Sequence, residues 1–182
     1  LKTNSFQNDE LVHTFKKGSR QKEGFVEDYA FLADAALALY GSTLKVDNLQ
    51  FAQKLHTIAE ARFLDKTSGM YRYNDSDELI AKIIKTNDGV LPSPNAVMAH
   101  NLFRLGHIEY NMEYAKRSKQ MLSAMVPAII ESAASYSKWN ALLLNNTYPY
   151  YEIAVVGKNA NTLIKAINEK NLPNTLVVGS TT

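Results

Sequence analysis

Residues 27–40 read EDYAFLADAALALY, and this stretch decides the fold class. Beyond the first two residues Asp34 alone carries a charge, so the pattern predicts a helix that is buried on most of its faces. Glu27 and Asp28 lie in its first turn, where the helix dipole and the free backbone N–H groups favour negative charge. Gly41 follows and predicts the end of the helix. Such a helix requires other helices around it.

The segments that follow alternate between two kinds of helix. Residues 46–63 place apolar side chains at steps of three and four, which predicts a helix with a single buried stripe. A second buried helix is predicted to begin with Ser93 as its N-cap and Pro94 in its first turn, and Gly106 is predicted to follow its end. Residues 110–134 predict a second striped helix, and residues 135–144 a third segment of the buried kind.

This alternation predicts a mainly α fold of antiparallel helical hairpins, arranged as a partial α/α toroid with inner helices enclosed by outer ones. A helical solenoid would produce a similar pattern, but the sequence has no fixed period with repeated side chains. Between the first two hairpins, residues 65–75 alternate apolar and polar side chains around Gly69, as a short extended segment or hairpin does.

The carboxy-terminal residues are different in kind. Residues 152–157 and 175–179 read as short β-branched strands, and residues 161–168 between them read as a helix. We therefore divide the chain into a partial α/α barrel at 1–150 and a small βαβ appendage at 151–182. Two strands make a poor independent sheet, so we expect the appendage to pack on the barrel or to be completed elsewhere.

Composition excludes several function classes. The 20 basic and 18 acidic residues nearly cancel, so we expect no nucleic-acid partner. The basic run Lys16, Lys17, Arg20 and Lys22 reads as a solvated loop. Cysteine is absent, which excludes disulfides and dithiol redox chemistry within these residues. No apolar run approaches the roughly 20 residues that span a membrane. We expect a cytoplasmic protein without a metal or cofactor.

Four blocks of the sequence resemble a known family. They are GFVEDYAFL at 24–32, GMYRY at 69–73, DGVLPSPNA at 88–96 and EIAVVG at 152–157. In order and spacing they resemble the spermatogenesis-associated thioredoxin-domain proteins and their bacterial relatives, in which a thioredoxin-like domain precedes an α/α barrel similar to N-acylglucosamine 2-epimerase. Pro94 and Ala96 stand where that family usually has glycine and serine, so this turn lacks one flexible residue and one hydroxyl.

The resemblance implies a six-hairpin glycosidase-like barrel that holds a small carbohydrate at one end, and an upstream thioredoxin-like domain as partner. It leaves two functions open. One is a carbohydrate-binding or sugar-epimerase-like domain, whose chemistry would be epimerase-, isomerase- or glycosidase-like proton transfer. The other is a non-catalytic scaffold for the redox domain. A partial ring exposes the flanks of its inner helices, so we also expect this chain to form homodimers.

Four residues are candidates for acid–base catalysis. Asp28 and Glu27 at the start of the first buried helix are paired carboxylates, although helix capping would explain them equally well. Asp88 lies in the turn before the second buried helix, where it either reaches the same cavity mouth or stabilises the turn. His100 is the histidine on a predicted inner helix, and a core role is its alternative.

The candidate substrate-binding residues are polar and aromatic side chains near the same helix starts. Aromatic rings stack on the apolar faces of sugars, but they also fill protein cores. Polar residues at helix starts bind ligands or cap the helix. This set comprises Tyr29, Tyr71, Tyr73, Ser93, Asn95 and Trp139.

Overall fold

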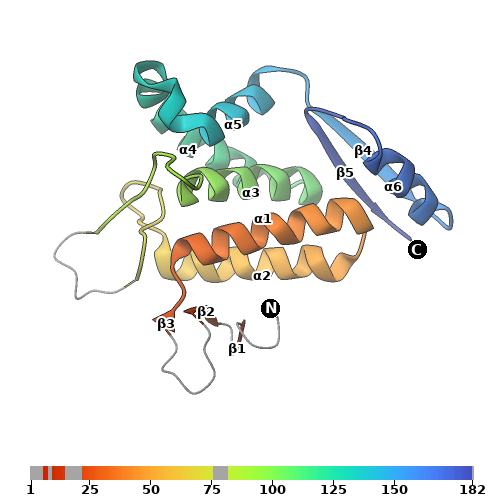
Figure 1. The fold of residues 1–182 in the computed structure, drawn as a ribbon, viewed down its shortest axis with the longest axis horizontal. Coiled ribbons are helices and arrows are strands. Elements are labelled where there is room, and N and C mark those ends of the chain that lie inside the picture. Colours follow the sequence, from red (N-terminus) through yellow and green to blue (C-terminus); the bar gives the residue numbers. More distant parts are fainter. Residues whose placement is uncertain (1–5, 8–9, 15–21, 76–81, 182) are drawn as a thin grey trace.

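Six α-helices and five short strands form within the residues that the computed structural model describes, 6–7, 10–14, 22–75 and 82–181 (Figure 1). The helices are α1 (Val26–Thr43), α2 (Val46–Phe63), α3 (Pro94–Glu109), α4 (Met112–Glu131), α5 (Ser137–Thr147) and α6 (Ala160–Asn168). The strands are β1 (Phe6–Gln7), β2 (Glu10–Thr14), β3 (Lys22–Glu23), β4 (Tyr151–Val156) and β5 (Thr175–Ser180). Lys16, Lys17 and Arg20 of the basic run lie outside the described residues.

The helices pack in pairs, which confirms the mainly helical fold. α1 packs on α2 and α3 packs on α4, while α3 also contacts α1 on one side and α5 on the other. Figure 1 shows that α1, α3 and α5 run in the same direction, so their amino-terminal ends lie at one end of the molecule. The predicted inner helices are therefore neighbours.

Burial distinguishes α3 from its two neighbours. Twelve residues of α3 are buried, from Pro94 to Gly106, on all sides of the helix. The prediction that α1 is buried on most faces is wrong for one flank, because Ala35 and Ala38 are exposed and Leu39 is 52% exposed. In α5, Trp139 and Leu142 are the residues that are buried in the described structure. The reason is positional: α3 lies between α1 and α5, whereas among the described elements α1 and α5 each have one of these three helices beside them, which is α3.

The two striped helices were predicted correctly. α2 spans the predicted residues and buries one face, from Ala52 to Phe63. α4 buries Ser118, Met121, Leu122, Met125 and Ile129. It is shorter than predicted, because Asn111 caps its start by accepting hydrogen bonds from the N–H groups of Glu113 and Tyr114, and a 3-10 turn, η1 (Ala133–Tyr136), follows its end.

Neither helical glycine ends its helix, contrary to the prediction. α1 continues past Gly41 to Thr43, and α3 continues past Gly106 to Glu109. Gly106 instead permits a close approach, because a Cβ there would lie 2.9 Å from the backbone nitrogen of Ala115 in α4. A Cβ at Gly41 would lie 3.5 Å from the carbonyl oxygen of Val177 in β5, which is an ordinary van der Waals contact.

The β-structure was predicted in part. β4 and β5 pair in parallel with α6 between them in sequence, as expected, and Tyr40 of α1 joins this unit through its hydroxyl, which donates to the Gly179 carbonyl at 3.1 Å. An antiparallel bridge between Leu64 and Tyr71 encloses the turn at Gly69. The sheet β1-β2-β3 was not predicted, because its strands are too short to show a periodicity.

Candidate functional site

The amino-terminal ends of α1, α3 and α5 meet the connection between α2 and α3, and most of the predicted site residues lie here (Figure 1). Two groups of side chains are found at this end. One lies around Asp88, between the starts of α3 and α5. The other lies around Asp28, at the start of α1.

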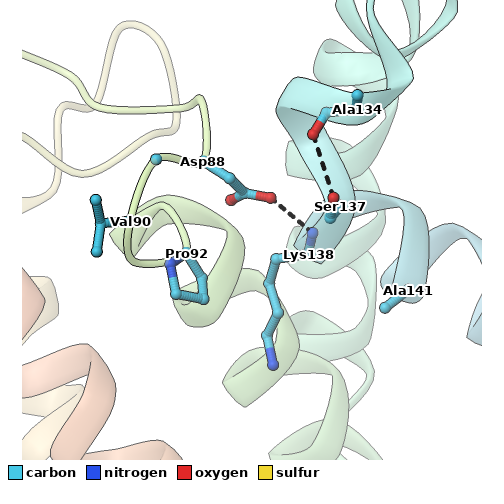
Figure 2. A pocket seen from close by; sticks show the side chains of 8 residues that line it. Asp88, Val90, Pro92, Ala134, Ser137, Lys138 and Ala141 are labelled. Carbon is cyan, nitrogen blue, oxygen red and sulfur yellow. Dashed lines mark hydrogen bonds between the residues drawn. The ribbon is translucent and has the colours of Figure 1, made fainter.

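Asp88 connects two helix starts. One carboxylate oxygen accepts a hydrogen bond from the backbone N–H of Ser93 at 2.8 Å, before α3, and the other accepts from the N–H of Lys138 at 2.8 Å, in the first turn of α5. Figure 2 shows the carboxylate directed at that second N–H group. The helix dipole and the free N–H groups at these ends favour its negative charge. Asp88 therefore connects the start of α3 to the start of α5.

A cavity of about 440 Å³ lies beside this carboxylate. It is lined by Asp88, Gly89, Val90, Pro92, Ala134, Ser137, Lys138 and Ala141. Val90 is fully exposed and forms one side of the opening, while Ser137 and Ala141 of α5 lie across from it (Figure 2). Each Asp88 oxygen has a second lone pair that the backbone does not use. The Asp88 cavity is thus lined by one aspartate, one serine, one lysine and apolar residues.

The second group, here called the α1 cluster, comprises His13, Phe25, Glu27, Asp28, Tyr73 and Lys85. Asp28 accepts a hydrogen bond from the Phe25 N–H at 2.8 Å, as a helix-capping carboxylate does. The same carboxylate lies 3.0 and 3.1 Å from Nδ1 of His13 in β2. The centres of the Phe25 and His13 rings lie 4.8 Å apart, in an edge-to-face arrangement. An imidazole and a carboxylate are thus paired beside an aromatic side chain.

Glu27 forms the other half of the α1 cluster. Its carboxylate accepts a hydrogen bond from the Tyr73 hydroxyl at 2.9 Å and lies 3.7 Å from the Lys85 ammonium. That ammonium also lies 3.6 Å from the centre of the Tyr73 ring, which stacks on Phe25 at 4.8 Å. Burial, and the hydrogen bond to Glu27, raise the pKa of Tyr73 to about 12, so its hydroxyl keeps its proton at neutral pH.

The two groups remain separate, because no described contact joins the α1 cluster to Asp88. The convergence of Asp28 and Asp88 on one cavity mouth stays a prediction. Both carboxylates do lie at the end where the inner helices begin, and both bind backbone N–H groups there.

Five of the predicted substrate-binding residues are almost fully buried and bond to the protein itself. The Ser93 hydroxyl accepts from the Ala96 N–H, and the Asn95 amide bonds both backbone groups of Tyr71. The Tyr29 and Tyr71 hydroxyls accept from Arg62 and Arg117, respectively. The Trp139 indole donates to the Thr86 carbonyl. Tyr73, by contrast, is partly exposed.

His100 is buried in α3 beside the start of α5. Its Nε2 lies 2.8 Å from the Lys138 carbonyl oxygen, so this nitrogen carries the proton and donates it. Burial, together with the charge of Lys138, lowers the pKa of His100 to about 4. The imidazole is therefore neutral in the folded protein at neutral pH.

This pKa predicts a loss of stability in mild acid. The unfolded chain binds a proton at His100 near its ordinary pKa of about 6.5, and the folded chain does not until about pH 4. Lowering the pH from about 7 to about 5 is therefore expected to cost about 2 kcal/mol through this residue. His100→Gln can still donate a hydrogen bond to the Lys138 carbonyl. Its free energy of unfolding, measured with urea, should therefore fall by about 2 kcal/mol less than that of the wild-type chain between about pH 7 and about pH 5. His107→Gln, at a half-exposed histidine, is the control, and an equal reduction there would contradict the prediction.

Sequence reasoning missed three members of the α1 cluster. His13 lies 15 residues before its partner Asp28, and Lys85 reaches Glu27 from the connection before α3. Phe25 precedes the helix and reads as an ordinary apolar residue. Their proximity results from chain folding, and no local spacing indicates it. Within the described part of the chain, no three His, Asp or Glu side chains gather closely enough to hold a metal ion.

These features define a mainly helical chain of paired helices, with polar and aromatic side chains at the starts of α1, α3 and α5. No family model matches the chain. Over 162 residues it is 25% identical to spermatogenesis-associated protein 20 of Rattus norvegicus, and 24% identical to the Homo sapiens protein of that name. Each of these matches covers 85% of this chain. It is also 25% identical to an uncharacterized Caenorhabditis elegans protein over 131 residues, or 68% of the chain.

The chain is thus a distant homologue of spermatogenesis-associated protein 20. It spans about a fifth of the length of these curated relatives. No helix in the described ranges is long and apolar enough to cross a membrane.

Proposed function

We propose that this chain contributes helical hairpins to an α/α barrel in a longer protein and binds a carbohydrate at the end where α1, α3 and α5 begin. The observation that carries this proposal is the Asp88 cavity, because it joins polar side chains and apolar surface at the starts of two inner helices. Its volume of about 440 Å³ accommodates a small sugar. The order of inner and outer helices, and the distant homology, support the barrel.

A screen of sugars by thermal unfolding tests the proposal. A ligand that binds only the folded chain stabilises it by about 2.7 kcal/mol at 100 times its dissociation constant. For a chain of this length we expect the unfolding midpoint to rise by about 5–10 °C.

A variant that fills the cavity locates the site. Ala141→Phe places a ring among the lining residues and is expected to abolish the shift. Ala124→Phe introduces the same side chain at an exposed alanine of α4 and should leave the shift intact. A shift that survives Ala141→Phe would place the ligand elsewhere, and no shift with any sugar would contradict carbohydrate binding.

The second candidate function is a non-catalytic scaffold, which docks an upstream thioredoxin-like domain. The observation that favours it is the use of Asp28, Asp88 and Asn95 by backbone groups of the chain itself. These hydrogen bonds stabilise the fold, so a structural role explains why these polar side chains are present without any substrate. The sugar screen separates the two functions.

The exposed flank of α1 predicts self-association. Ala35, Ala38 and Leu39 present an apolar surface at helical spacing, on the side where α1 has no inner neighbour among the described helices. We expect light scattering to show homodimers at high concentration, and Leu39→Glu to shift them to monomers. Tyr110→Glu replaces an apolar side chain that is 83% exposed elsewhere and serves as the control. A monomeric wild-type chain would contradict the prediction.

A further inference from the structure

The residues that line the Asp88 cavity include two of opposite charge, Asp88 and Lys138. Both lie where the connection before α3 meets the first turn of α5. Their charges are compensated to different extents within the described part of the chain. This difference gives the cavity a preference for one class of sugar.

The negative charge of Asp88 is largely offset by backbone groups. Its two oxygens accept hydrogen bonds from the N–H groups of Ser93 and Lys138, at the starts of α3 and α5. The start of a helix carries about half a positive elementary charge, so two helix starts together balance about one carboxylate. Each oxygen keeps a further lone pair. Asp88 can therefore accept hydrogen bonds from sugar hydroxyl groups without strongly repelling an anion elsewhere in the cavity.

The positive charge of Lys138 is not offset in this way. The hydrogen bonds described for Lys138 belong to its backbone, whose N–H donates to Asp88 and whose carbonyl accepts from His100. No described carboxylate forms an ion pair with its ammonium group. Figure 2 shows the Lys138 side chain extending away from the Asp88 carboxylate. The cavity therefore has an unpaired cation and a hydrogen-bond acceptor at separate positions.

The apolar lining residues suit the carbon–hydrogen faces of a sugar ring. Val90 is fully exposed, Ala141 is exposed in α5, and Pro92 lines the cavity with them. Apolar lining with a few polar groups is the usual composition of a small-molecule site. These residues provide contact area, while Asp88 and Lys138 determine which polar groups a ligand must carry.

We propose that the Asp88 cavity takes a hexuronic acid, whose carboxylate pairs with Lys138 and whose hydroxyl groups donate to Asp88; this rests on the proposed carbohydrate function. A uronic acid carries its carboxylate at one end of the ring and hydroxyl groups across the ring from it. That arrangement matches a cation and an acceptor at separate positions. A hydrogen bond between an ammonium and a carboxylate is also shorter and stronger than one between neutral groups.

Titration calorimetry of the chain with matched sugars measures this preference. D-glucuronate and D-glucuronamide have the same ring, and the amide replaces the carboxylate with a neutral group of the same shape. We expect D-glucuronate to bind about tenfold or more tightly than D-glucuronamide and D-glucose, the scale of one hydrogen bond to a charged group. D-glucose 6-phosphate separates a carboxylate site from a phosphate site.

Substitutions of Lys138 test the cation. Lys138→Met keeps an unbranched side chain without the charge, and D-glucuronate is expected to lose about tenfold in affinity and its advantage over the amide. Lys138→Arg keeps the charge and should keep the preference. Lys119→Met is the control, because Lys119 is exposed in α4 and lines none of the described cavities. Its removal should change the affinity by less than about twofold, since distant exposed charges are screened.

The backbone connection between α3 and α5 does not depend on the Lys138 side chain. Its hydrogen bonds to Asp88 and His100 use the N–H and carbonyl groups, which every substitution keeps. Circular dichroism and the unfolding midpoint show whether each variant is folded. If Lys138→Met does not fold, the preference of the wild-type chain for D-glucuronate over the amide, and the loss of that preference in high salt, still test the proposal.

Equal affinity of the wild-type chain for D-glucuronate and D-glucuronamide overturns the uronic acid as ligand and leaves carbohydrate binding intact. Tighter binding of D-glucose 6-phosphate than of D-glucuronate also overturns it. A preference for D-glucuronate that survives Lys138→Met overturns the role of Lys138. If neither the acidic nor the neutral sugars bind, the proposed function and the uronic acid preference fail together.

Discussion

Replacing Asn95 by leucine is expected to destabilise the chain by about 4 kcal/mol, because two buried hydrogen bonds and one partly buried hydrogen bond lose their partner. The Asn95 side-chain oxygen accepts from the Tyr71 N–H at 2.7 Å, and its amide donates to the carbonyls of Tyr71 at 3.0 Å and Lys85 at 2.9 Å. Asn95 itself has no exposed surface. Leucine has a similar volume, so the loss of stability measures the cost of leaving the backbone groups of Tyr71 and Lys85 without their hydrogen-bond partner.

The measurement is urea unfolding followed by circular dichroism. Asn146→Leu is the matched control, since Asn146 is exposed and donates to Leu142 within its own helix, and it should change stability by less than about 0.5 kcal/mol. Equal stability of the Asn95 variant and the wild-type chain would show that the loop before α3 is not held by this amide. Reduced sugar binding with unchanged stability would instead restore Asn95 as a ligand residue.

Replacing Trp139 by alanine is expected to cost about 4 kcal/mol for a different reason, the removal of a large side chain from the core. Trp139 is fully buried at the start of α5, and its indole N–H donates to the Thr86 carbonyl at 2.8 Å. The substitution opens a cavity where α5 packs on α3 and leaves a carbonyl unpaired. Because α5 contributes one wall of the Asp88 cavity, sugar binding should weaken in parallel with the loss of stability.

Two comparisons separate packing from hydrogen bonding at this position. Trp139→Phe retains most of the buried ring and should cost about 1–3 kcal/mol, much of it for the unpaired Thr86 carbonyl. Tyr148→Ala removes an aromatic side chain that is 62% exposed and should be nearly neutral. A stable Trp139→Ala chain that has lost sugar binding would indicate a stacking role in place of a core role.

The fold was largely predictable where the sequence signal lies within a single helix. Ser93 and Pro94 correctly predicted the start of α3, and the stripe of residues 46–63 predicted the whole of α2. The ends of α1 and α3 were not predicted, because Gly41 and Gly106 lie inside these helices, and Leu44 and Tyr110, each in the left-handed conformation, follow their last residues.

For the candidate site, the sequence predicted several of the residues but not which side chains contact one another. Glu27, Asp28 and Tyr73 were predicted as candidates and do lie together in the α1 cluster. Their partners His13 and Lys85 were not predicted. The resemblance predicted the end of the helices at which these residues lie, and burial in the folded chain separates the partly exposed Tyr73 from the buried Tyr29 and Tyr71.

By itself the sequence determined that this chain forms paired helices followed by a βαβ unit. Apolar periodicity and helix caps act between residues three or four apart, so they can be read directly from the order of residues. Only the tertiary structure decided that Asn95 holds Tyr71, that Asp88 spans two helix starts, and that His13 meets Asp28. Those contacts join separate elements, and their geometry depends on how the helices pack against one another.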